Sequence, residues 1–91
     1  MKIQRRANGN VVFTLIGRLT AADVSELSTL LATEPADRLV LDLKDVVLVD
    51  REIVRFLRAC KRGGIALHNC PPYIREWIAR EEDEEQTDVS G

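Results

Sequence analysis

Leu39-Val-Leu-Asp-Leu-Lys-Asp-Val-Val-Leu-Val-Asp50 leads directly into Arg51-Glu52-Ile53-Val54, and this junction carries most of the structural information in the chain. Near-continuous runs of valine and leucine are typical of strands that are covered on both faces. The run therefore predicts a buried strand over Leu39–Leu43, a short turn and a second apolar segment. Asp50 then predicts the start of a helix, because its carboxylate can accept hydrogen bonds from the first unpaired backbone N–H groups.

The composition indicates one small folded domain. The chain has 91 residues, of which 45% are hydrophobic and 31% charged, a balance that suits a globular protein rather than a disordered one. Only four residues are aromatic, so the core must be mainly aliphatic. No apolar stretch approaches the ~20 residues of a membrane-spanning helix, and the first residues lack the apolar segment of a secretory signal. We therefore expect a cytoplasmic protein without membrane insertion.

The rest of the chain alternates between strand and helix signals. Asn8-Gly9 predicts a hairpin between two extended segments, because both residues tolerate positive φ. The expected elements are strands at 2–6 and 11–16, a helix after Thr20, a strand at 39–43, a helix at 51–62, a strand at 65–69 and a helix from Pro71-Pro72. The order ββαβαβα predicts a small mixed α/β sheet, in which an N-terminal hairpin is joined by parallel strands and the helices pack against the sheet.

This series resembles the STAS domain, the fold of bacterial anti-sigma factor antagonists. The resemblance covers about Val11 to Ile78 and rests on segments in the right order and spacing. They are Leu15-Ile-Gly-Arg-Leu-Thr20, Leu39-Val-Leu-Asp-Leu-Lys-Asp-Val-Val-Leu-Val-Asp50, Ile65-Ala-Leu-His-Asn69 and the last helix. The resemblance implies a STAS-like fold and a non-enzymatic domain that acts in signalling and transcription regulation. It also implies that the start of the second helix contacts a protein partner.

The chain departs from the family at the residue after Asp50. In phosphorylation-switched members, the aspartate at this position is followed by a serine that a partner kinase modifies. Arg51 occupies the serine position, and Glu52 and Ile53 occupy those of the next family serine and glycine. The resemblance therefore implies a regulator without the phosphoserine switch. Its expected partner is an anti-sigma factor, a kinase-like protein or another signalling protein.

The second helix has an apolar side and a basic side. At 100° per residue, the apolar side must face the sheet and the basic side is expected to face water. The apolar residues are Ile53, Phe56, Leu57 and Cys60, and the arginine stripe is Arg51, Arg55, Arg58 and Arg62. Such a stripe is either a solvated face or a docking surface for an acidic partner, since guanidinium groups bind carboxylate or phosphate through two hydrogen bonds. The predicted partner-binding residues are Asp50, Arg51, Glu52, Arg55, Arg58 and Arg62.

The C-terminal segment differs in charge from the remainder of the chain. Residues 81–91 carry six acids and no base, whereas the preceding eighty residues carry thirteen bases and nine acids. We expect one STAS-like domain over residues 1–80 and an acidic, disordered tail over residues 81–91. The tail is either a solubilising end or an internal partner that covers the arginine stripe.

Other functions stay open on the residues alone. The arginine stripe could bind nucleic acid or another polyanion, but the modest charge of the domain and the lack of exposed aromatic residues beside the stripe disfavour this. The domain could also be a structural subunit of a larger assembly. We find no catalytic set, no phosphate-binding loop and no metal-ligand spacing around Cys60, Cys70 or His68. We therefore expect no enzyme activity, cofactor or metal.

Overall fold

The computed structural model describes the backbone of residues 1–90 and the side chains of residues 1–83. Its elements are β1 (Lys2–Asn8), β2 (Asn10–Leu19), the 3-10 helix η1 (Ala21–Asp23), α1 (Val24–Leu31), the 3-10 helix η2 (Ala36–Arg38), β3 (Leu39–Val49), α2 (Arg51–Arg62), β4 (Ala66–His68) and α3 (Pro72–Ser90). The strands form one sheet in the order β1-β2-β3-β4, antiparallel between β1 and β2 and parallel elsewhere. The predicted order of elements and the mixed α/β sheet are confirmed.

Several elements begin where the sequence signals lie, although β2 continues to Leu19, beyond its predicted end at residue 16. Gly9 forms the predicted turn between β1 and β2 with a φ of 82°, a conformation that glycine adopts at no steric cost. The backbone N–H of Thr20 donates a hydrogen bond of 2.9 Å to the Asp23 carboxylate at the start of the first helical segment. The last helix starts at Pro72, where a missing N–H costs little. Within the described residues, no helix is both long enough and apolar enough to cross a bilayer.

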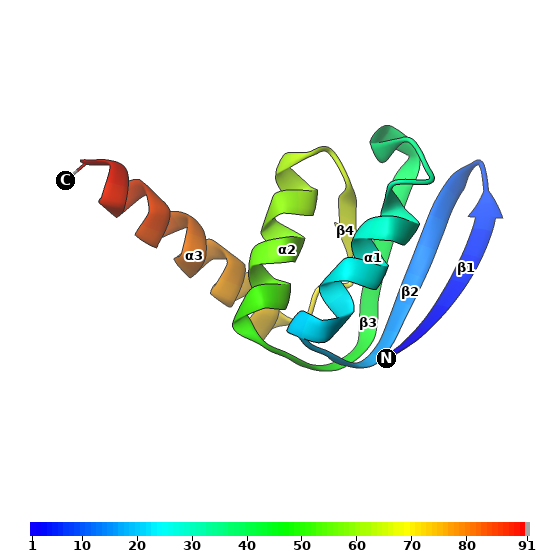
Figure 1. The fold of residues 1–91 in the computed structure, drawn as a ribbon, viewed down its shortest axis with the longest axis horizontal. Coiled ribbons are helices and arrows are strands. Elements are labelled where there is room, and N and C mark those ends of the chain that lie inside the picture. Colours follow the sequence, from blue (N-terminus) through cyan, green and yellow to red (C-terminus); the bar gives the residue numbers. More distant parts are fainter. Residues whose placement is uncertain (91) are drawn as a thin grey trace.

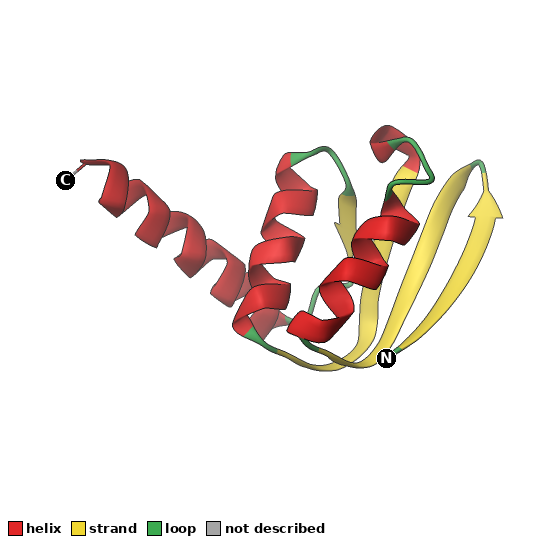
Figure 2. Ribbon diagram, in the orientation of Figure 1, coloured by secondary structure: helices red, strands yellow, loops and turns green. Residues whose placement is uncertain are grey.

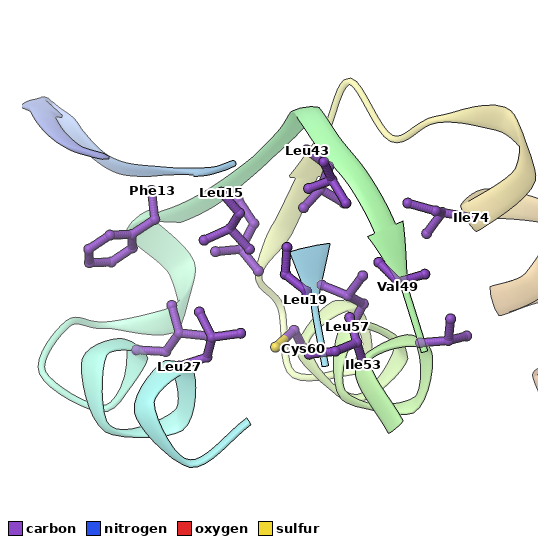
Figure 3. Close-up of a cluster of buried hydrophobic side chains, with 14 of the residues drawn as sticks. Phe13, Leu15, Leu19, Leu27, Leu43, Val49, Ile53, Leu57, Cys60 and Ile74 are labelled. Atoms are coloured by element: carbon purple, nitrogen blue, oxygen red, sulfur yellow. The ribbon is translucent and has the colours of Figure 1, made fainter. Parts of the chain in front are cut away.

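Helices α1 and α2 lie beside each other over one face of the sheet, and α3 begins next to α2 and extends away from it (Figures 1 and 2). The space between helices and sheet is filled by aliphatic side chains (Figure 3). The residues with no exposed surface include Leu15, Leu19, Leu41, Leu43, Ile53, Leu57 and Ile74. Phe13 is the one aromatic side chain that is buried in the described part of the chain, as the low aromatic content predicts.

Strand β3 is continuous, so the expectation of a turn after Leu43 is wrong. The register between β2 and β3 shifts twice. The first shift lies between the pairs Thr14–Asp42 and Ile16–Asp45. The second shift lies between the pairs Gly17–Val46 and Arg18–Leu48. Each shift places one extra residue on β3, which is the definition of a β-bulge. Core-facing positions are therefore two apart before the first bulge and three apart after it, as in the buried series Leu39, Leu41, Leu43, Val46 and Val49.

Side-chain hydrogen bonds support the bulged part of β3. The Asp42 carboxylate accepts hydrogen bonds from the backbone N–H of Lys44 at 3.1 Å and from the side-chain amide of Asn69 at 3.2 Å. Farther along, the backbone carbonyl of Val47 accepts a hydrogen bond of 2.9 Å from the Tyr73 hydroxyl at the start of α3. These contacts occupy backbone groups on the part of β3 that extends beyond its pairing with β4. The bulges also leave Val47 and Leu48 exposed next to the start of α2.

The core positions of β3 should dominate the stability of the domain. Leu41→Ala removes a fully buried side chain from the centre of the sheet and should lower the free energy of unfolding by about 2–5 kcal/mol. Val47→Ala, at a position that is 66% exposed, should change it by no more than about 0.5 kcal/mol. Urea denaturation followed by circular dichroism measures both. Similar losses for the two variants would contradict the assignment of inward and outward positions.

Candidate functional site

Asp50 joins three segments at the start of α2. One carboxylate oxygen, Oδ1, accepts a hydrogen bond from the backbone N–H of Ile53 at 3.0 Å, which makes Asp50 the N-cap of the helix. The other oxygen, Oδ2, accepts a hydrogen bond from the backbone N–H of Ala21 at 2.7 Å. The predicted capping role is confirmed. Because both oxygens already accept backbone hydrogen bonds, Asp50 positions the surface around it, and its predicted contact with a partner stays a prediction.

The side of α2 that carries the arginine stripe faces α3 in part. Arg51 Nε lies 3.0 Å from a carboxylate oxygen of Glu81, and Arg55 Nε lies 3.6 Å from the other. Arg58 is half-buried, and its guanidinium donates a hydrogen bond of 3.3 Å to the backbone carbonyl of Glu81. The expectation that the whole stripe faces water is therefore wrong. Three of its four arginines contact one residue of the last helix.

Glu81 also corrects the predicted domain boundary. Helix α3 passes residue 80 without a break, and the Glu81 side chain is only 8% exposed. The acidic segment therefore begins inside the folded domain, and the expectation of a disordered tail from residue 81 is wrong at its start. The physical reason is charge neutralisation. Burial of an unpaired carboxylate costs free energy, and the α2 guanidinium groups offset this cost by pairing with Glu81. The side chains of residues 84–91 lie outside the described part of the chain.

The Glu81 carboxylate is held in its charged form. Burial by itself raises the pKa of this carboxyl, but the hydrogen bond and charge of Arg51 and the charge of Arg55 outweigh burial. The pKa therefore lies below its ordinary value of 4.5. The ion pair also accounts for an unfavourable feature of the sequence, namely a cation in the first turn of α2, where the helix dipole disfavours positive charge. Glu81 supplies the opposite charge at that point.

The outer part of the site stays accessible. The side chains of Arg51 and Arg55 are 56% and 47% exposed, and Glu52 lies on the surface with a carboxylate oxygen 3.8 Å from Arg55. Arg62 is exposed at the end of α2. Five of the predicted residues therefore lie along one side of this helix, and Asp50 fixes where the helix begins.

On the apolar side of α2, Ile53, Leu57 and Cys60 are buried as predicted, whereas Phe56 is only partly buried (Figure 3). Burial raises the pKa of the Cys60 thiol to about 11, which keeps the thiol protonated and unreactive at neutral pH. Both cysteines are free. Within residues 1–83, no three histidine, cysteine, aspartate or glutamate side chains form a group that could hold a metal ion.

Reasoning from the sequence placed Glu81 in an acidic tail that either solubilises the chain or covers the arginine stripe, and missed it as a buried residue of the last helix. The signal was present in the spacing of the last helix, since Ile74, Ile78 and Glu81 follow one another at intervals of four and three residues. Residues at this spacing lie on one face of a helix. The same periodicity that buries the two isoleucines therefore carries Glu81 onto the face that meets α2. An acid on an apolar face predicts a cationic partner there.

The Asp50 cap should contribute measurably to stability. Asp50→Ala removes both acceptors and should lower the free energy of unfolding by about 0.5–2 kcal/mol, and Asp50→Asn, which keeps one side-chain oxygen acceptor, should lower it less. Asp45→Ala, at an exposed position of β3, is the matched control and should have an effect below about 0.5 kcal/mol. Urea denaturation is the measurement. Equal effects for the Asp50 and Asp45 variants would contradict the capping role.

The Glu81 ion pairs should make stability depend on pH in a defined direction. Because the folded pKa lies below the ordinary value, the contribution is complete above about pH 4.5 and is lost as the pH falls through the folded pKa. Wild type should therefore melt at a higher temperature than Glu81→Gln at about pH 7, and this difference should shrink at about pH 3. Glu76→Gln, at an exposed position of α3, should melt like wild type at both pH values. A Glu81→Gln difference that persists undiminished in acid would exclude the ion pair as its cause.

Comparison with known proteins gives a fold and no family. No protein-family model matches the chain, and no curated protein matches it. Among solved structures, the domain is similar to a chain described as "Crystal Structure Analysis of Mglu", with a TM-score of 0.53 and 19% sequence identity. The similarity covers 78% of this chain and 19% of that chain, so the chain spans about a fifth of the length of that structure. At this identity, the likeness supports a small α/β fold.

Proposed function

We propose that this chain is a non-enzymatic protein-interaction module of STAS type, similar to an anti-sigma factor antagonist but without the phosphoserine switch. On this proposal, it binds a regulatory protein through the start and the outer face of α2. The observation that carries the proposal is the half-exposed arginine pair, Arg51 and Arg55, at a helix start that Asp50 fixes in position. The sequence resemblance to the STAS domain supports the same surface.

The surface has the composition of a protein interface. Interfaces are enriched in arginine, and their central parts are apolar. Here the exposed side chains of Val47 and Leu48 lie three and two residues before Asp50, and the arginines follow it. The aliphatic stem of an arginine can pack on apolar groups while its head pairs with an acid. A partner with both apolar and acidic side chains would complement this arrangement.

The charge at the family's phosphoserine position is reversed. A phosphoserine carries about −1.5 to −2 charges at neutral pH, whereas Arg51 carries a permanent positive charge. Binding would therefore not be switched by phosphorylation at this position. The proposal places control of binding in the partner or in another part of this chain. Free Cys60 and Cys70 suit the reducing cytoplasm that a bacterial signalling protein of this kind would occupy.

Polyanion binding is the weaker proposal for the same residues. Nucleic-acid binding requires several cations that are directed at phosphates. In the described part of the chain, Arg51, Arg55 and Arg58 instead contact Glu81, which lowers the positive potential of the stripe. A role as a structural subunit of a larger assembly would also use a protein-binding surface, and the size of the complex in native extract distinguishes it.

The proposed interface can be tested by charge reversal. The double variant Arg51→Glu, Arg55→Glu should abolish capture of the partner by tagged protein from native extract, as identified by mass spectrometry, because it replaces two cations at the centre of the interface with anions. Capture that is undiminished would count against this surface.

Two further variants separate binding from folding. The charge reversal also repels Glu81, so the neutral pair Arg51→Gln, Arg55→Gln should be tested alongside it and should weaken capture by about tenfold or more if each lost pair costs at least 0.7 kcal/mol. Arg6→Glu, Arg38→Glu makes the same change in charge at two exposed positions on β1 and η2 and should leave capture intact. Circular dichroism must show the same helix content for all of them.

A further inference from the structure

The Glu81 carboxylate lies where an incoming anion would bind. Two guanidinium groups, those of Arg51 and Arg55, approach its two oxygens from α2. Glu81 is the one charged residue that is buried among residues 1–83. Arg58 contacts the main chain of Glu81 instead of the carboxylate, so the backbone of α3 and the carboxylate are held by different arginines. The two guanidinium groups therefore bind an oxyanion that belongs to the same chain.

We propose that Arg51 and Arg55 form an oxyanion-binding site that Glu81 occupies in the free protein, and that a partner binds by placing a carboxylate or phosphate there in its stead. The inference rests on the proposed function, because it names the chemistry that the partner must present at the same surface. It adds a mechanism of control, since the affinity for the partner then depends on how readily Glu81 leaves. Glu81 acts as an internal competitor.

Replacement of the Glu81 carboxylate by an external anion does not require the hydrophobic core to open. Helix α3 is anchored by Ile74 and Ile78, which are buried two turns and one turn before Glu81. The side chains of Arg51 and Arg55 are about half exposed although Glu81 is buried, so a competing anion can approach the two guanidinium groups from their outer sides. Salt screens the charge of guanidinium groups that are in contact with solvent. The carboxylate can therefore leave while the isoleucines stay in place.

The test uses the full chain and two simple probes, sodium phosphate and a short polyglutamate peptide. Each is titrated at low salt while the Nε–H signals of Arg51 and Arg55 are followed by NMR. Glu81→Gln and Glu81→Ala should each bind a probe about tenfold or more tighter than wild type, because an internal competitor has been removed. The alanine variant is included because a glutamine oxygen can still accept a hydrogen bond from an arginine. Response to phosphate alone or to polyglutamate alone identifies the preferred oxyanion and also supports the proposal.

Matched controls decide the outcome. Glu76→Gln removes the same charge from an exposed position of α3 and should bind the probes like wild type. Equal affinities for wild type and both Glu81 variants, or no response of the arginine signals in any of them, would overturn the inference. If the arginine variants lose capture of the partner but the Glu81 variants bind the probes like wild type, the proposed interface is supported and the role of Glu81 as a competitor is rejected. If the Glu81 variants bind the probes more tightly but the arginine variants still capture the partner, the oxyanion-binding site is supported and the proposed function is rejected.

Discussion

The arrangement of the helices over the sheet depends on one carboxylate. Asp50 lies where β3 ends and α2 begins, and its two oxygens bind a backbone N–H of α2 and a backbone N–H of the segment that leads into α1. A single side chain therefore ties together the exits of two parallel strands. Apolar packing is not directional, so it does not by itself fix where a helix begins. At the starts of α1 and α2, the hydrogen bonds of Asp50 supply this direction. The direction in which α2 presents its outer side follows from this junction.

The contact between α2 and α3 combines two kinds of interaction with different properties. Ile74 and Ile78 are buried against the core, and such contacts involve no charge that could be titrated or screened. One turn later, Glu81 meets Arg51 and Arg55, and these contacts respond to both conditions. The first half of the described helix is thus a fixed part of the fold, and the ionic contact that follows it is adjustable. The proposed function uses the adjustable part.

Much of this fold could be predicted because its signals are local. Asn8-Gly9, Asp50 and Pro71-Pro72 each mark a boundary through the chemistry of one or two residues, and the structure confirms them. The bulges in β3 could not be predicted, because Lys44-Asp45 reads as a turn until the pairing with β2 is known. The arginine stripe was found from its spacing, but its contact with α3 depends on how two helices separated in sequence are packed. That long-range relation is not encoded in either segment alone.

The two extra residues in β3 have a consequence for how this chain can change over time. Each bulge advances the strand by one position relative to β2, and together they set which way the last residues before Asp50 point. Loss or gain of a single residue between Leu43 and Val49 would exchange inward and outward side chains up to the helix and misdirect Asp50. Substitution of the outward residues leaves this alternation in place. The length of this segment is therefore more tightly constrained by the fold than its outward side chains.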